Sequence, residues 1–82
     1  MHETHLLKNL FKYLEAEELE SSKKIRRLHI ALSEFGGMTP EHFLEHYRQA
    51  SGGTKWAGLE FEFTKVAYGP EFEITKIEFS KP

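Results

Sequence analysis

Cysteine is absent from this chain of 82 residues, and its absence excludes several kinds of chemistry. Without thiols there are no disulfides, zinc ribbons, iron–sulfur clusters or thiol nucleophiles. The chain also lacks any apolar run near the roughly 18–20 residues that a membrane span needs. Its N-terminal stretch has no basic region followed by an apolar run, so we expect no signal peptide, no membrane partner and a cytoplasmic protein.

The chain also lacks a large excess of positive or negative charge. The chain has 11 Lys and Arg residues against 13 Asp and Glu residues, which gives a formal net charge of −2 at pH 7. Because no basic face dominates, we expect no nucleic-acid partner. With 39% hydrophobic and 29% charged residues, the composition is that of a globular protein. At this length, residues 1–82 are expected to form one domain.

Two segments have the apolar periodicity of amphipathic helices. In the first, from about His2 to Glu20, leucine recurs every four residues. The second follows Thr39-Pro40-Glu41, where threonine is a favourable N-cap and proline suits the first helical position. Gly52–Gly53 is expected to end this second helix.

Three further segments alternate apolar and polar residues, as half-buried strands do. They are Ile25–Leu32, Leu59–Thr64 and Phe72–Phe79. In the third segment the apolar phase shifts by one residue between Ile74 and Ile77. This shift predicts a β-bulge near Thr75–Lys76.

The order of these elements, α-β-α-β-β, predicts an α+β domain in which two helices pack on a three-stranded mixed sheet. The turn Ala67–Pro70 brings the second and third strands close enough to form an antiparallel hairpin. The first and second strands are joined through a helix, so as neighbours they should run parallel. The Phe-rich strands are expected to supply the core and not a ligand pocket.

The N-terminal Met1-His2-Glu3 is the first candidate site. A free α-amine, the backbone amides that follow it and an imidazole can chelate a divalent metal in one plane, and such square-planar nitrogen coordination suits Ni(II) or Cu(II). His5 is near enough along the chain to add a ligand. The alternative is that His2 is a solvated residue without a ligand role.

The second candidate is His42-Phe43-Leu44-Glu45-His46, in which two histidines share one helix face. Its letters match the H-x-x-E-H pattern of one group of zinc metalloproteases. Those enzymes need a further carboxylate ligand and a substrate cleft that this chain is too small to build. We therefore expect no enzymatic activity, and the simplest interpretation is a polar helix face in contact with water.

Three other features are weaker. The segment Gly52–Lys55 ends in Gly-Thr-Lys, but it lacks the spacing of a phosphate-binding loop and is interpreted as a helix stop. Trp56 is expected to pack over a sheet edge, with an interface anchor as the alternative. His29 lies on the polar phase of the first strand and is expected to be solvated. The chain offers no convincing pair of nucleophile and base.

The order of these pieces resembles the HypA family, the nickel metallochaperones of hydrogenase and urease maturation. The family shares the Met-His-Glu opening, and it usually has Gly-Glu where this chain has Ser33-Glu34. The similar segments are Met1–Glu3, Leu28–Glu34, Gly53-Thr54, Ala57–Glu60 and Gly69–Phe79. They span nearly the whole chain, and the resemblance depends on their order and spacing.

One large departure accompanies this resemblance. HypA proteins carry a zinc module with two CxxC pairs between the second and third strands, where this chain has only the turn at residues 67–70. The resemblance therefore implies a nickel-binding domain without a zinc site of the family type.

For the nickel site, the resemblance implies particular ligands. In the family, the amine and backbone nitrogen near Met1, the imidazole of His2 and the backbone nitrogen of Glu3 bind nickel, and this chain has all of these groups. The implied cargo is Ni(II), and the implied partners are hydrogenase or urease maturation proteins, including a GTPase. His5, His42 and His46 match no family ligand.

Two other functions remain as alternatives. The first alternative is a metal-free protein-interaction module that keeps only the fold. The second is a hydrolytic enzyme with a zinc site at His42, Glu45 and His46. We rank the nickel carrier first, the interaction module second and the enzyme third.

Overall fold

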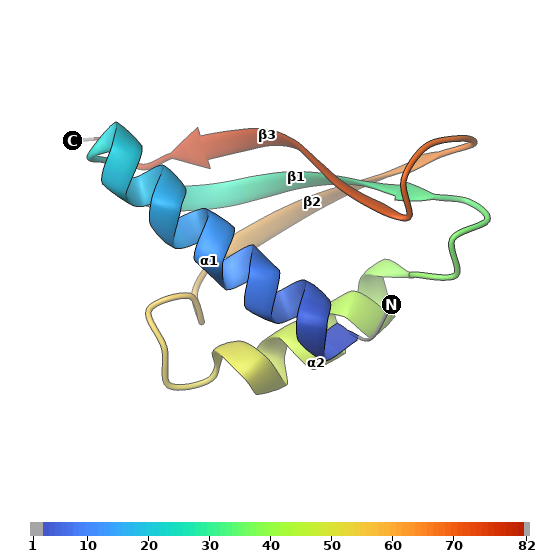
Figure 1. The fold of residues 1–82 in the computed structure, drawn as a ribbon, viewed down its shortest axis with the longest axis horizontal. Coiled ribbons are helices and arrows are strands. Elements are labelled where there is room, and N and C mark those ends of the chain that lie inside the picture. The colour runs from blue at the N-terminus through green and yellow to red at the C-terminus, as the bar shows by residue number, and fades with distance from the viewer. Residues whose placement is uncertain (1–2, 82) are drawn as a thin grey trace.

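The computed structural model describes residues 3–81 and confirms the predicted α+β architecture (Figure 1). Two helices pack on a three-stranded mixed sheet with the strand order β2-β1-β3. The elements are α1 (Glu3–Ser21), β1 (Ile25–Ser33), α2 (Pro40–Ser51), β2 (Glu60–Val66) and β3 (Phe72–Phe79). Within this described part of the chain, neither helix has both the length and the apolar character that crossing a bilayer demands.

The central strand, β1, pairs with both other strands. It runs parallel to β2, with Leu28 opposite Phe61, and antiparallel to β3, with Leu28 opposite Ile77. The parallel pairing of the first two strands, joined through α2, is as predicted. Because both pairings extend along most of β1, this strand aligns the whole sheet.

The predicted β-bulge is confirmed on β3. His29 lies opposite Lys76, and the next residue, Ile30, lies opposite Ile74. Thr75 is therefore the extra residue that has no partner in the register. The bulge keeps the apolar residues on both sides of it directed towards the helices.

The predicted hairpin of the second and third strands is wrong, because β2 and β3 form opposite edges of the sheet (Figure 1). Residues 67–71 cross the end of β1. Strands two places apart are separated by about 10 Å, and five residues at about 3.3 Å each are long enough to span that gap. The central position suits β1 because three of its side chains, Leu28, Ile30 and Leu32, are at most 3% exposed.

Backbone contacts hold this crossing against the end of β1. The N–H of Glu34 donates to the carbonyl of Val66 at 2.7 Å, and the N–H of Ser33 donates to the carbonyl of Glu71 at 3.4 Å. Gly36 lies against the same segment, because a Cβ at this position would stand 2.7 Å from Cγ of Glu71. A larger residue at position 36 would displace the crossing segment.

The core lies between the helices and one face of the sheet. Its buried hydrophobic members are Leu7, Leu10, Leu14, Ile25, Leu28, Ile30, Leu32, Phe43, Tyr47 and Trp56. The ring of Phe43 lies 5.3 Å from that of Phe61 on β2 and 5.3 Å from that of Phe72 on β3. The Phe-rich strands thus contribute to the core, as predicted, and α2 contacts both edge strands.

The boundaries of α2 follow the predicted signals. The hydroxyl of Thr39 accepts a hydrogen bond from the backbone N–H of His42 at 3.2 Å, and Pro40 is the first helical residue. The helix ends at Ser51, and Gly53 follows with a positive φ of 80°, a conformation that glycine adopts without strain. These caps fix where the side chains of α2 point, including both of its histidines.

Candidate functional site

The predicted N-terminal metal site lies at the boundary of the described structure. Met1 and His2 lie outside the described residues, and α1 begins at Glu3. A helix leaves its first four backbone N–H groups without acceptors inside the helix. The backbone nitrogen of Glu3 is one of these groups, so metal coordination there breaks no helical hydrogen bond.

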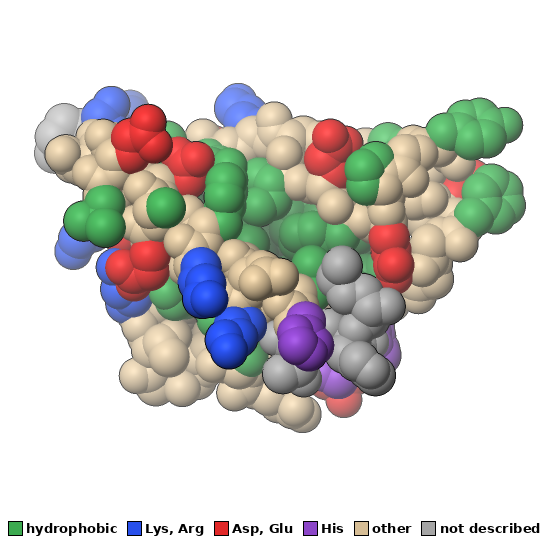
Figure 2. Space-filling model, in the orientation of Figure 1, with side chains coloured by type: hydrophobic (Ala, Val, Ile, Leu, Met, Phe, Trp, Pro, Cys, Tyr) green, Lys and Arg blue, Asp and Glu red, His purple; other side chains and the backbone are tan. Residues whose placement is uncertain are grey.

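Histidines gather at the end of the molecule where α1 begins. Figure 2 shows His side chains on the face that α1 and α2 form, and His46 of α2 lines a groove together with Leu7 and Lys8 of α1. His5 lies near the start of α1 and is exposed. The fold thus brings histidines from two helices to the same end, which their separation in the sequence did not indicate.

His42 and His46 contact one another on the surface of α2. Their ring centroids are 4.6 Å apart, and the ring planes are inclined by 54°. His42 is exposed, whereas His46 is half-buried and lines a groove with Leu7 and Phe11 of α1. The prediction of a water-exposed helix face therefore holds for His42 and in part for His46.

The zinc-hydrolase interpretation of this segment gains no support. Among residues 5–81, whose side chains the structure describes, no group of three or more His, Cys, Asp or Glu side chains is placed to hold a metal ion. Glu45 therefore does not join the two histidines as a third ligand.

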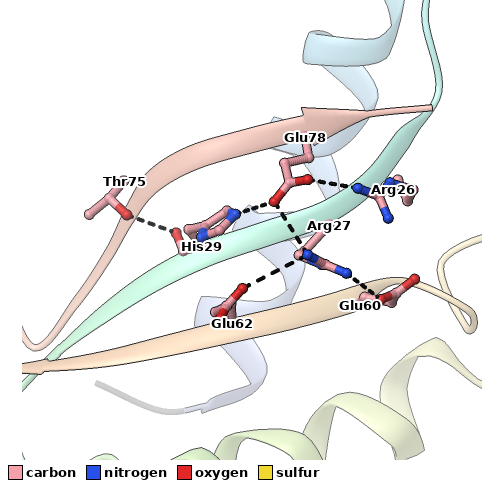
Figure 3. A network of polar contacts seen from close by, with 7 residues as sticks. All are labelled: Arg26, Arg27, His29, Glu60, Glu62, Thr75 and Glu78. Carbon is pink, nitrogen blue, oxygen red and sulfur yellow. Dashed lines mark hydrogen bonds and ion pairs between the residues drawn. The ribbon is translucent and has the colours of Figure 1, made fainter. Parts of the chain in front are cut away.

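A polar network covers the face of the sheet that points away from the core (Figure 3). Its members are Arg26, Arg27 and His29 of β1, Glu60 and Glu62 of β2, and Thr75 and Glu78 of β3. Arg27 lies in the middle, with Nη2 3.0 Å from Oε1 of Glu60 and Nη1 3.6 Å from Oε2 of Glu78. One guanidinium on β1 thus contacts carboxylates on both edge strands.

His29 belongs to this network, so the prediction that it is solvated is wrong. Its side chain is 24% exposed, and its Nε2–H donates to the carboxylate of Glu78. Nη2 of Arg26 contacts the other oxygen of that carboxylate at 2.7 Å. The hydrogen bond from His29, together with the positive charges of Arg27 and Arg26, lowers the pKa of Glu78 below its usual value.

The chemistry of the network is that of a surface ion-pair cluster. Each of its charged side chains has an opposite charge within the cluster, and Thr75 at the bulge donates to the carbonyl of His29 at 3.3 Å. Cross-strand pairs of opposite charge stabilise a sheet and favour one register over another. We interpret the network as a structural feature that aligns the three strands, and not as a catalytic site.

Glu78→Gln is expected to reduce the loss in the free energy of unfolding that accompanies a fall in pH. Because the folded pKa of Glu78 is lowered, its ionised form stabilises the fold above the unfolded pKa, and this stabilisation is lost as the pH falls through the folded pKa. The variant and the wild type should therefore differ near neutral pH and converge in acid. Urea unfolding midpoints measured between about pH 3 and pH 7 test this.

Glu73→Gln is the matched control, because Glu73 is an exposed carboxylate on the same strand. It should leave the pH profile of the wild type unchanged. A profile of Glu78→Gln that runs parallel to that of the wild type at every pH would contradict the assignment.

The segment after α2 is structural. Trp56 is 6% exposed, so it belongs to the core and the interface-anchor alternative is wrong. Its carbonyl accepts a hydrogen bond from the hydroxyl of Tyr47 at 2.5 Å, and burial raises the pKa of that hydroxyl. Lys55 lies 4.7 Å from the Trp56 ring centroid, and its Nζ is 3.1 Å from a carboxylate oxygen of Glu18. The Gly-Thr-Lys sequence thus ends α2, and its lysine contacts α1.

Comparisons with known proteins leave the family open. The chain matches no protein-family model, no curated protein and no solved structure. The resemblance to the HypA family therefore remains a prediction from the sequence segments described above.

Proposed function

We propose that this domain is a HypA-like protein that binds Ni(II) and delivers it during hydrogenase or urease maturation, with Met1, His2 and Glu3 holding the metal. The observation that carries the proposal is the sequence Met1-His2-Glu3, whose third residue, Glu3, is the first residue of α1. The amine, the imidazole and the first backbone nitrogens are all possible metal ligands, and none of them takes part in a hydrogen bond within the helix.

The donor set favours late first-row metals. Amine, amide and imidazole nitrogens in one plane suit Ni(II) and Cu(II), and the general order of affinities places Cu(II) above Ni(II). Copper should therefore bind at least as tightly as nickel in vitro. Selectivity for nickel in a cell would then depend on metal supply and on the partner protein.

The fold supports a metal site at this position because it holds α1 firmly. Leu7, Leu10 and Leu14 are at most 5% exposed and anchor the helix on the core. At the other end of α1, a carboxylate oxygen of Glu18 accepts a hydrogen bond from the N–H of Ile25 at 2.7 Å. A metal bound at the start of α1 would therefore be presented from a fixed helix at one end of the molecule.

Delivery can be tested in a strain that lacks its own nickel metallochaperone for hydrogenase. At limiting nickel, the wild-type chain should restore hydrogenase activity, and His2→Ala at equal abundance should not. Equal restoration by both proteins would contradict the N-terminal site and favour the metal-free interaction module. Failure of both would contradict the delivery role.

A further inference from the structure

The histidine pair of α2, His42 and His46, lies outside the polar network on the sheet. Residues four apart lie on the same face of a helix, so His42 and His46 stand one turn apart with their rings in contact. Their neighbours in the sequence, Phe43 and Tyr47, are 1% and 2% exposed and hold this part of α2 against the core. The backbone that carries the pair is therefore rigid.

The distance between the two rings fits a particular coordination geometry. An imidazole nitrogen binds a metal such as zinc at about 2.0–2.1 Å, which places the ring centre about 3.2 Å from the ion. Two such rings have centroids about 4.5 Å apart at a bond angle of 90°, and about 5.2 Å apart at the tetrahedral angle. The observed separation of 4.6 Å is close to the value for two neighbouring positions of a square-planar or octahedral ion with one nitrogen of each ring facing it.

We propose that His42 and His46 together chelate one Ni(II) or Cu(II) ion, as a second metal site on α2. Imidazole ligands suit both metals, and square-planar or tetragonal geometry is typical of Cu(II) and Ni(II) and not of zinc. The preceding residues, Glu41 and Glu45, are exposed carboxylates that add negative charge on this helix. Lys8 lines the groove beside His46, but it is exposed and its charge is screened by water.

Two protein ligands make a site that exchanges its metal readily. Among residues 5–81, whose side chains the structure describes, no group of three or more His, Cys, Asp or Glu side chains is placed to hold a metal ion, so the proposed site has His42 and His46 as its two ligands there. A site with few protein ligands suits a metal that is passed on and not stored. That role rests on the proposed function, whereas the binding itself rests only on the geometry of the pair.

The test uses a full-length chain in which the N-terminal site is disabled by His2→Ala and by one extra residue before Met1. Calorimetric titration with Ni(II) should still show one bound ion. Removing a group that only hydrogen-bonds to a metal ligand costs about 10–100-fold in metal affinity, so removing a ligand itself, by His42→Ala or His46→Ala in this background, should weaken binding at least about tenfold. Circular dichroism should show an unchanged fold, because the removed side chains lie on the outer face of α2 or in its groove.

A matched control changes the spacing and keeps the composition. Glu41→His/His42→Glu moves one histidine by one position, so that the two histidines are five residues apart and point about 140° away from each other. The swap leaves imidazole–carboxylate pairs in place of the imidazole pair, and imidazole suits Ni(II) better than carboxylate does, so this variant should bind Ni(II) more weakly than the parent with both histidines in place. Unchanged affinity in either variant, or no bound nickel once the N-terminal site is disabled, would overturn the proposal. The second outcome would leave the N-terminal site untouched.

Discussion

Phe43→Ala is expected to lower the free energy of unfolding by about 3–5 kcal/mol, the usual range for deleting a buried phenylalanine ring. The side chain is 1% exposed, and its ring contacts Phe61, Phe63 and Phe72 on the two edge strands. Removing it opens a cavity between α2 and both edges of the sheet. Small domains are stable by about 5–15 kcal/mol, so much of the total stability would be lost. Urea unfolding followed by circular dichroism measures the change.

Phe35→Ala is the matched control for this prediction. Phe35 is 81% exposed, and substitutions at such surface positions usually change stability by no more than about 0.5 kcal/mol. Similar losses in the two variants would contradict the core described here.

Leu14→Ala is expected to cost about 2–5 kcal/mol, because Leu14 is the fully buried residue of α1, with 0% exposure. Its loss would weaken the contact of the helix that leads to the N-terminal metal site. The unfolding midpoint in urea measures the effect, and nickel affinity measured well below that midpoint should remain.

Leu19→Ala provides the control on the same helix. Leu19 is 79% exposed, and alanine has the highest helix propensity, so this variant should match the wild type or exceed it slightly. A loss of stability at Leu19 as large as that at Leu14 would show that α1 packs on the sheet through a different face.

The helices and strands were predictable because their signals are local. Apolar periodicity, the Thr39 cap and the glycines after Ser51 each act within one or two turns of chain. The strand order was not predictable in the same way. The length of the turn after β2 permits either a hairpin or a crossing of one strand, and the choice depends on burying Leu28 and Ile30 in the middle of the sheet.

The polar network could not be predicted for the same reason. Arg27 contacts Glu60 on β2 and Glu78 on β3 only because β1 lies between these two strands. In the predicted hairpin β2 would lie between β1 and β3, which would separate Arg27 from Glu78. The sequence did indicate that the strands have a charged face, because charged residues alternate with apolar residues along them. By contrast, the spacing of His42 and His46 indicated a shared helix face, although the distance between their rings required the structure.

The central claim, nickel binding by Met1, His2 and Glu3, is tested most directly by titrating Ni(II) calorimetrically into the chain with its native N-terminus and into a variant with one extra N-terminal residue. The extension moves the free amine away from His2 and leaves the fold unchanged. We expect one Ni(II) ion to bind tightly to the N-terminus of the native chain, and we expect the extension to abolish this binding and leave only the binding by His42 and His46. Tight binding that survives the extension, or no tight binding to the native chain, would contradict the account.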